Sequence, residues 1–312
     1  MKKIAILGAT GHIAKSLILN FKKSDKYSLC LFARSNEKLD NFLKSINYYN
    51  DIIKINLNNF NKEKYDVVIN CIGIGDPGKL ENIGSEIFRI TEYYDNFILD
   101  YLKSNNDCKY INFSSGAAYG RDFSIPANEL KCCEININQI CDKDNYGIVK
   151  IYSEAKHRSC ENLNIVDLRI FAFFSRFIDL DARYFIAELI SCIKAGSEFV
   201  TSSNDIVRDF IHPIDLFNLV NLCINAKKIN DVFDAYSLEP ATKFEIINYF
   251  VDNYGLKYKV QSGILGVNVT GIKDNYYSIN KKAEKAGYKP VYTSMDCIVE
   301  QSKAILDEIF RI

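Results

Sequence analysis

The chain has 312 residues, a length typical of one large α/β domain or of two lobes. Hydrophobic residues make up 48% and charged residues 25% of the sequence, which excludes a largely disordered protein. The 39 basic and 39 acidic side chains cancel, so we expect neither nucleic acid nor a membrane as a partner.

In the first two-thirds of the chain, short β-rich segments alternate with helical patterns, which predicts a parallel sheet covered by helices on both faces. The predicted strands are 3–8, 27–34, 51–57, 66–72, 109–114 and 165–171. The predicted helices are 11–21, 36–45, 85–103 and 146–163, followed by 182–195, 215–226, 243–253 and 296–310. We therefore expect a Rossmann-type, doubly wound α/β fold. Its dinucleotide-binding domain would span 1–174. A smaller, mostly substrate-binding lobe would span 175–312, with some segments returning to the first domain.

Cysteine and histidine usage favours a reduced protein without metal. The ten cysteines include no Cys-x-x-Cys pair and lie mostly in apolar segments, which predicts free thiols and a cytoplasmic location. None of the three histidines stands near a second ligand at metal-site spacing, so we expect no metal site. The apolar run after Lys2 and Lys3 is shorter than the roughly 7–15 residues of a signal-peptide core.

A glycine-rich turn, Gly8-Ala9-Thr10-Gly11-His12-Ile13-Ala14, lies between the first predicted strand and the first helix. Glycines there allow close backbone approach, and the start of the helix offers free N–H groups to a diphosphate. The alternative interpretation is a turn without ligand, and Ala14 stands where the pattern has its third glycine. The turn favours a dinucleotide site. Its candidate contacts are Gly8, Thr10, Gly11, His12 and Ile13.

The second predicted strand ends in Arg34 and Ser35. An acidic residue at this place would bind the ribose 2′-hydroxyl of NAD, whereas an arginine suits the 2′-phosphate of NADP. Arg34 and Ser35, with Lys38 nearby, therefore favour NADP(H), although NAD(H) stays possible. The alternative is an ordinary solvated arginine at the end of a strand.

Tyr146 and Lys150 are four residues apart, on one face of a predicted helix. This spacing alone is uninformative, because Tyr152/Lys156 and Tyr277/Lys281 share it. The preceding strand, however, ends in Ser115, and sites of open α/β sheets lie at the carboxyl ends of strands. The combination predicts a hydroxyl, a phenol and an ammonium at one site.

Four segments together resemble the extended short-chain dehydrogenase/reductases, the NAD(P)-dependent epimerase/dehydratase group that acts on nucleotide sugars. They are the glycine turn, 114–120 (Ser-Ser-Gly-Ala-Ala-Tyr-Gly), Tyr146-x-x-x-Lys150 with Glu154, and 208–216 (Arg-Asp-Phe-Ile-His-Pro-Ile-Asp-Leu). The segment 278–290 is similar to the closing segment of the family. The resemblance covers essentially the whole chain.

The resemblance implies roles for single residues. Ser115 would bind the reacting oxygen of the sugar, Tyr146 would give or take its proton, and Lys150 would hold the nicotinamide ribose. Arg208 would bind the substrate diphosphate, the alternative being a surface ion pair with Asp209. Further cofactor contacts would come from Asn56 and Leu57 on the adenine side and from Cys71, Ile72 and Gly73 on the nicotinamide side. His212 is expected to be structural and His157 to be a surface residue.

Two parts of the sequence depart from the family pattern. Ala172 stands where the family has a substrate-binding asparagine, so a standard UDP-hexose is not assured. Gly116 and Ala117 stand where the dehydratases carry an Asp-Glu pair. Without a carboxylate to protonate a leaving hydroxyl, dehydration is not expected.

The first functional hypothesis is an enzyme, an NADPH-dependent reductase that delivers hydride to C4 of a nucleotide-activated 4-keto-6-deoxy sugar, with Tyr146 as proton donor and a role in polysaccharide biosynthesis. Arg34 favours it, because NADPH is the usual reductant. The alternative is a nucleotide-sugar 4-epimerase with bound NAD(P). A non-catalytic NADP-binding sensor is the third hypothesis, disfavoured by Ser115, Tyr146 and Lys150. The expected assembly is a homodimer formed through helices 85–103 and 146–163.

Overall fold

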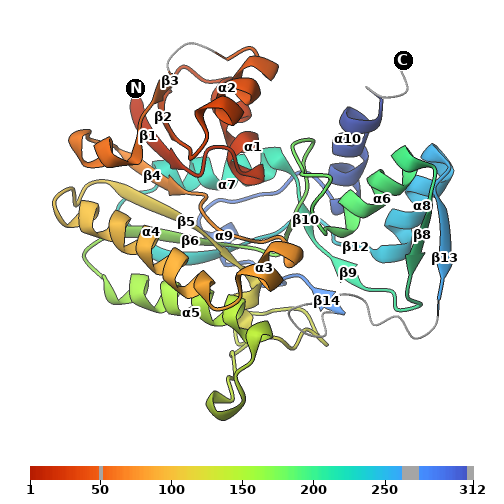
Figure 1. Cartoon of the computed structure of the whole chain (residues 1–312). Helices are drawn as coiled ribbons and strands as arrows, with labels where there is room; N and C mark the ends of the chain where they lie inside the picture. The colour runs from red at the N-terminus through yellow and green to blue at the C-terminus, as the bar shows by residue number, and fades with distance from the viewer. Residues whose placement is uncertain (49–51, 262–273, 308–312) are drawn as a thin grey trace.

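A seven-stranded parallel sheet forms the centre of the computed structural model, which describes residues 1–48, 52–261 and 274–307 (Figure 1). Its strand order is β11-β6-β5-β4-β1-β2-β3. The strands are β1 (Lys2–Leu7), β2 (Tyr27–Phe32), β3 (Ile52–Lys54), β4 (Val67–Asn70), β5 (Lys109–Ser115), β6 (Asn164–Ile170) and β11 (Asn230–Ala235). The prediction of a Rossmann-type fold is confirmed. Because all seven strands are parallel, their carboxyl ends lie at one edge of the sheet.

Strand β1 is apolar from Ile4 to Leu7 because both faces of the sheet are covered. In β1, Ile4 and Ile6 pack into the core on one face of the sheet. The alternate residues, Ala5 and Leu7, pack into the core on the other face. All four side chains are fully buried. Because successive side chains in this part of the strand point alternately into two cores, neither of its faces is exposed to water. The consecutive residues from Ile4 to Leu7 are therefore all apolar.

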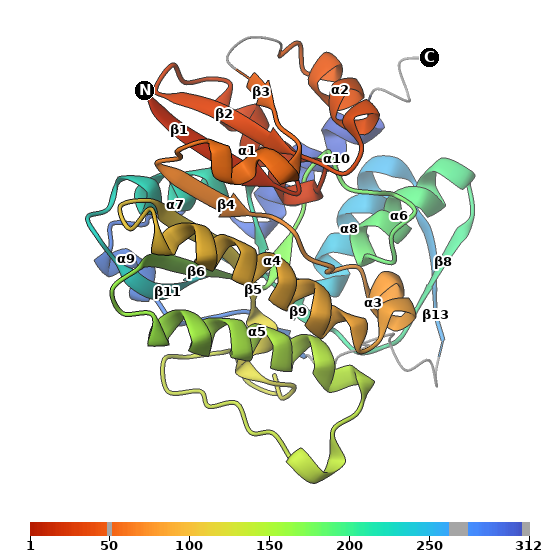
Figure 2. The same cartoon turned by 60° about the vertical axis from the view of Figure 1, so that its left-hand side comes forward.

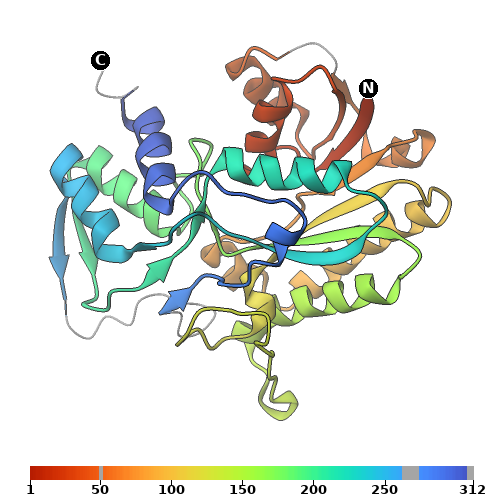
Figure 3. The ribbon, with the colours of Figure 1, turned by 180° about the vertical axis from the view of Figure 1, so that it is seen from behind.

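Helices cover the two faces in separate groups. On one face lie α1 (His12–Phe21), α2 (Asn36–Ser45) and α7 (Pro213–Asn225), the last visible in Figure 3. On the other face, α4 (Glu86–Lys103) and α5 (Asp142–Ser159) lie side by side (Figure 2). The outer surfaces of α4 and α5 expose Tyr93 and Tyr152. A homodimer through these two helices stays a prediction, tested by sedimentation at micromolar concentration.

Several helices begin or end a few residues away from their predicted bounds, and one helix was not predicted. Helix α5 begins at Asp142 rather than at 146, because Cys141 and Asp144 form a capping box there. A short helix, α3 (Pro77–Ile83), was not predicted. It begins with Asp76 as its cap and Pro77 in its first turn, and none of its residues is buried, so it carries no apolar periodicity.

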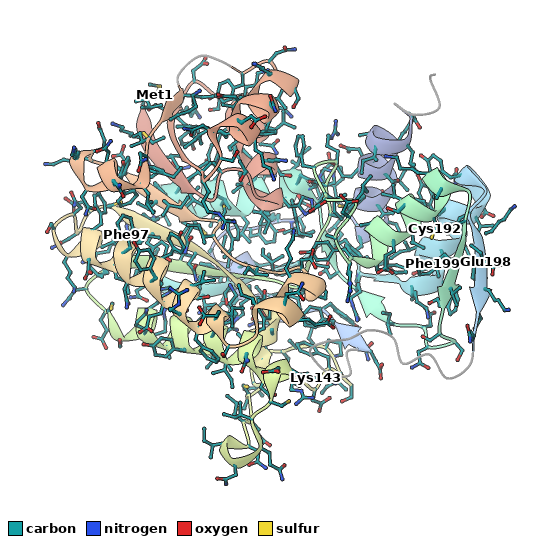
Figure 4. The ribbon with its side chains drawn as sticks, viewed as in Figure 1. Met1, Phe97, Lys143, Cys192, Glu198 and Phe199 are labelled. Carbon is teal, nitrogen blue, oxygen red and sulfur yellow. The ribbon has the colours of Figure 1, made fainter. Side chains whose placement is uncertain are left out.

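The second lobe contains α6 (Phe185–Ala195), α8 (Lys243–Tyr254) and α10 (Ser294–Leu306), with residues 308–310 of the last predicted helix outside the described residues. Its core includes Leu189 and Phe250. The short strands are β7 (Ala172–Phe173) with β10 (Phe210–Ile211), β8 (Glu198–Thr201) with β13 (Lys257–Val260), and β9 (Val207–Arg208) between β12 (Ala241–Thr242) and β14 (Asn275–Tyr276). Figure 4 labels Cys192, Glu198 and Phe199 in this lobe. Strand β11 and the short helix α9 (Lys282–Lys285) lie with the first domain.

All ten cysteines are free. Across 1–48, 52–261 and 274–307, no helix is both long and apolar enough to span a bilayer. Within the same residues there is no cluster of three or more histidine, cysteine or acidic side chains arranged to hold a metal ion.

His157 is buried, so the prediction of a surface residue is wrong. Its ring lies between two carboxylates: Nδ1 is 2.9 Å from Oδ1 of Asp167, and Nε2 is 2.8 Å from Oδ1 of Asp95. The spacing already places position 157 on the buried face of α5, because Lys150 and Ser153, seven and four residues earlier, are buried too. The buried face of α5 is polar and was therefore not recognised by apolar periodicity.

We expect this histidine to make stability pH-dependent. Burial opposes its charge, but hydrogen bonds to Asp167 and Asp95 outweigh burial and raise the pKa of His157 to about 9. The folded pKa thus exceeds the unfolded value near 6.5, so the contribution is fully present below pH 6.5 and is lost as pH rises through 9. Urea unfolding should show a loss of about 3 kcal/mol over this interval. His157→Gln should abolish that part of the pH dependence; an unchanged profile in the variant would contradict the assignment.

Candidate active site

The turn after β1 is built for close backbone approach. Gly8 has φ +74°, and a Cβ on it would lie 3.0 Å from the carbonyl carbon and oxygen of Cys71. Gly11 is the N-cap of α1 and provides no side chain to cap the helix. The first N–H groups of α1 therefore stay available to an anion, and they carry the positive end of the helix dipole. This cradle, which a Cβ at Gly8 would fill, fits the diphosphate of a dinucleotide.

The other predicted residues of this turn are half-buried: Thr10, His12 and Ile13. The ring of His12 packs on Phe173 with centroids 4.8 Å apart. Burial lowers the pKa of His12 to about 4, so the imidazole is neutral near pH 7. The ring thus fastens the turn to β7, at the start of the path to the second lobe.

Arg34 is exposed just beyond the end of β2. The side chain of Ser35 accepts a hydrogen bond from the Lys38 N–H at 3.2 Å and caps α2. Asn56 caps the turn η1 (Leu57–Lys62), accepting from Asn58 N–H at 3.0 Å, and Leu57 is half-buried. Of the four predicted adenine-side contacts Arg34, Ser35, Asn56 and Leu57, Arg34 is the one that carries a charge.

On the nicotinamide side, three predicted residues share one pocket between the end of β4, α4 and α5. The pocket is lined by Ile72, Gly73 and Lys150 together with Thr91, Asp95 and Ser153. The Lys150 ammonium donates to the Phe113 carbonyl at 2.9 Å and is almost fully buried. Burial raises the pKa of the Cys71 thiol, so this neighbour of Gly8 stays neutral.

Helix α5, which carries Tyr146, packs against the end of β5 and the turn that follows Ser115. Ser115 is the last residue of β5, and its Oγ accepts from Ala117 N–H at 3.2 Å, capping the turn η2 (Gly116–Tyr119). A Cβ on Gly147 would lie 3.0 Å from the Ala117 carbonyl oxygen. The missing side chain at 147 thus lets α5 approach η2 and brings Tyr146 to the Ser115 turn. The Lys150 ammonium lies 5.7 Å from the centroid of the Tyr146 ring.

A second tyrosine, which the sequence analysis did not single out, reaches the same serine. The Tyr276 hydroxyl lies 3.2 Å from Ser115 Oγ, although the two residues are 161 positions apart. Tyr276 is buried, and its pKa is raised by burial and by the neighbouring Tyr146. No local pattern marks Tyr276 among the 20 tyrosines of the chain. The pairing of β14 with β9 is what brings Tyr276 to Ser115.

Arg208 lies beside Tyr276, as its register partner on β9. The guanidinium carbon is 5.6 Å from the centroid of the Tyr276 ring. Burial lowers the pKa of Arg208 to about 10, which leaves it cationic at neutral pH. The Asp209 carboxylate is buried and accepts instead from Ser237 N–H at 3.1 Å, since successive strand residues face opposite sides. The surface ion pair between Arg208 and Asp209 is therefore the wrong alternative.

A protein-family model described as "NAD dependent epimerase/dehydratase family" matches residues 4–237. The match includes the glycine turn, Ser115, Tyr146, Lys150 and Arg208. The chain belongs to the NAD-dependent epimerase/dehydratase family. No curated protein is matched by its sequence.

Solved structures with the same fold include other members of this class. A UDP-glucose 4-epimerase from Stenotrophomonas maltophila, with bound NAD and formylated UDP-arabinopyranose, has TM-score 0.81 at 12% identity, covering 100% of this chain and 99% of that one. A UDP-glucose 4-epimerase from Bifidobacterium longum, with NAD⁺ and UDP, has TM-score 0.78 at 19% identity and 98% coverage of both. A dTDP-glucose 4,6-dehydratase from Bacillus anthracis, with NAD, has TM-score 0.78 at 14% identity, covering 99% and 97%.

Within this epimerase/dehydratase family member, the space next to Ser115 is restricted. A Cβ on Gly116 would lie 2.4 Å from a ring carbon of Phe171. Phe171 is buried and packs against Tyr276, with centroids 5.3 Å apart, so it has little room to yield. A carboxylate at position 116 could not be accommodated without repacking this ring.

Two ion pairs join α3 to the segment that leads into α6. Lys79 lies 3.3 Å from the Asp179 carboxylate, and Arg183 lies 3.0 Å from that of Glu81. Helix α3 follows the loop that packs on Gly8, and the partner segment follows β7, which packs on His12. We call these two pairs the clasp. The clasp joins two stretches of chain, and each of them follows a segment that packs against the glycine turn.

Proposed function

We propose that this chain is a nucleotide-sugar 4-epimerase that retains a nicotinamide dinucleotide. The observation that carries the proposal is the convergence of Ser115, Tyr146 and Arg208 beside the pocket that Lys150 lines. A hydroxyl, a phenol and a half-buried cation are the groups needed at a sugar oxygen and at its diphosphate. Family membership and the 4-epimerases among its structural relatives support the same reaction.

The residues that would hold the cofactor follow from the fit described above. The glycine turn would bind its diphosphate, Arg34 would lie at its adenosine ribose, and Ile72, Gly73 and Lys150 would line its nicotinamide side. When bound, such a group accepts a hydride from a sugar carbon and returns it.

The chain's own residues would manage the proton and the sugar. Tyr146 takes the proton of the C4 hydroxyl as the carbon is oxidised, and gives it back to the same oxygen when the carbon is reduced. Ser115 donates a hydrogen bond to that oxygen and stabilises the negative charge that develops on it. Arg208 holds the diphosphate, so that the sugar ring can turn while the nucleotide stays in place.

A nucleotide-sugar reductase is the second candidate, and Arg34 is the observation that favours it. An exposed arginine at the end of β2 suits the 2′-phosphate of NADPH. This was the first hypothesis from the sequence, and the comparisons support the epimerase better. A sugar donor for polysaccharide biosynthesis could be the product of either reaction. The convergence of Ser115 with the Tyr146 helix argues against a sensor without turnover.

The deciding experiment measures turnover with and without added cofactor. The purified chain is incubated with UDP-hexoses and no cofactor, and epimers are separated by chromatography; interconversion is the expected result. In parallel, oxidation of NADPH is followed with nucleotide-linked 4-keto-6-deoxy sugars. Interconversion that requires no added cofactor supports the epimerase. Net NADPH consumption without interconversion would replace it by the reductase, and cofactor binding without either reaction would favour the sensor.

Arg34 gives a prediction about cofactor choice. Arg34→Asp should shift the ratio of NADP⁺ to NAD⁺ affinity by about 10–100-fold toward NAD⁺, because one charge-assisted contact is lost and a repulsive charge is gained. Titration calorimetry on cofactor-free protein measures both constants. Arg89→Asp, a change at an exposed arginine of α4, is the control and should leave the ratio unchanged. An unchanged ratio in Arg34→Asp would mean that another group reads the 2′-position.

A further inference from the structure

The hydrogen bonds of Ser115 leave a question about its proton. A serine hydroxyl has one hydrogen to donate and two lone pairs that accept. One lone pair of Ser115 Oγ is taken by the Ala117 N–H at 3.2 Å. The Tyr276 oxygen, 3.2 Å away, is the second polar contact, and distance alone allows either oxygen to be the donor.

The surroundings of Tyr276 favour the tyrosine as donor. Burial, before any other cause, raises its pKa, so its hydroxyl keeps its proton at every pH at which the protein works. A phenol is more acidic than a serine hydroxyl, so the Tyr276 hydroxyl is the stronger donor of the two and offers its hydrogen. Ser115 Oγ, one hydrogen bond away, is in place to receive it.

The ring of Tyr276 is fixed on several sides. Phe123 packs on it edge to face with centroids 4.7 Å apart, and Phe171 lies at 5.3 Å. Arg208 lies against it from the neighbouring strand. These contacts hold the hydroxyl on Ser115 without requiring any motion of β14. A fixed donor of this kind fits the role of a positioning residue.

We propose that Tyr276 donates its hydroxyl hydrogen to Ser115 and thereby directs the serine's own hydrogen to the sugar oxygen; this rests on the proposed function. With both lone pairs of Ser115 Oγ occupied, by Ala117 N–H and by Tyr276, the remaining capacity of the hydroxyl is one outward-pointing hydrogen. Two donors on the same oxygen also polarise its O–H bond and strengthen it as a donor. The benefit is greatest where negative charge grows on the sugar oxygen, in the transition state.

The kinetic signature of this role is specific. Tyr276→Phe keeps the ring and removes the donor, so kcat should fall about tenfold, the effect expected for one hydrogen bond, while KM changes less than about twofold. In a Ser115→Ala background the same change should have no further effect on kcat, because Tyr276 acts through the serine. Substitution of position 276 by 4-aminophenylalanine, which restores a donor on the ring, should recover most of kcat.

Tyr119→Phe is the matched control. Tyr119 belongs to the same aromatic cluster, but its hydroxyl bonds to Asp234 at 2.8 Å and not to Ser115, so its kcat should stay within about twofold of the wild type. Binding of UDP is measured for every variant to show that the site is folded. An unchanged kcat in Tyr276→Phe, or an equal loss in the Ser115→Ala background, overturns the proposal while leaving the epimerase reaction standing. Absence of turnover by the unmodified chain overturns the proposed function and this role with it.

Discussion

Tyr146→Phe is expected to lower turnover of the nucleotide sugar by about 10²–10⁴-fold, the range typical of a general acid–base group. The change removes the oxygen that we propose exchanges a proton with the sugar. It keeps the ring that packs beside Lys150 and the glycine contact that seats α5 on η2. Cofactor affinity should therefore change little, since no other group of the cofactor cleft is altered.

Steady-state kinetics and a cofactor titration on the same preparation measure both quantities. Tyr152→Phe is the matched control, because Tyr152 lies on the same helix, also has a lysine four residues later, and is 47% exposed. The control should behave as the wild type. Wild-type turnover in Tyr146→Phe would remove the proton role from this residue.

Gly8→Ala is expected to weaken cofactor binding by about 100-fold. The new Cβ would stand 3.0 Å from the backbone of Cys71, and neither stretch of chain can yield as a flexible side chain could. Relief requires the turn to shift, and each charge-assisted hydrogen bond lost to the diphosphate costs about 1.5–3 kcal/mol. The positive φ at this position adds about 1 kcal/mol of strain to the folded state.

Gly196→Ala separates these two effects. Gly196 also has positive φ, +64°, but a Cβ there would meet nothing within 4 Å. It should lose stability to a similar extent in urea unfolding and keep its full cofactor affinity. Calorimetric titration with NAD⁺ and NADP⁺ compares the two variants. Equal cofactor affinity in both would contradict a diphosphate cradle at Gly8.

Local features of the site could be predicted from the sequence. The glycine turn is one continuous segment between a strand and a helix, so its conformation depends mainly on its own residues. Ser115 and the Tyr146–Lys150 pair could be placed because parallel strands direct their carboxyl ends to one edge. The first strand differs from its predicted bounds by one residue at each end, and the fifth strand by one residue at its carboxyl end.

Contacts that carry no local sequence pattern could not be predicted. Tyr276 reaches Ser115 through a two-residue strand, too short to carry any periodic pattern. His157 is buried between the polar side chains of Asp95 and Asp167, which lie on α4 and β6, so hydrophobic patterning did not identify its position as buried. Helix α3 is held by its cap and by exposed ion pairs rather than by a buried face. All three depend on partners that only the fold supplies.

A crystal structure of the chain with a nicotinamide dinucleotide and a UDP-sugar tests the central claim most directly. The account predicts that one hydroxyl oxygen of the sugar lies within hydrogen-bond reach, about 2.6–3.2 Å, of both Ser115 Oγ and the Tyr146 oxygen. It further predicts that Arg208 contacts the diphosphate of that sugar. A sugar bound away from Ser115, or a Tyr146 oxygen turned out of the cleft in the complex, would contradict it.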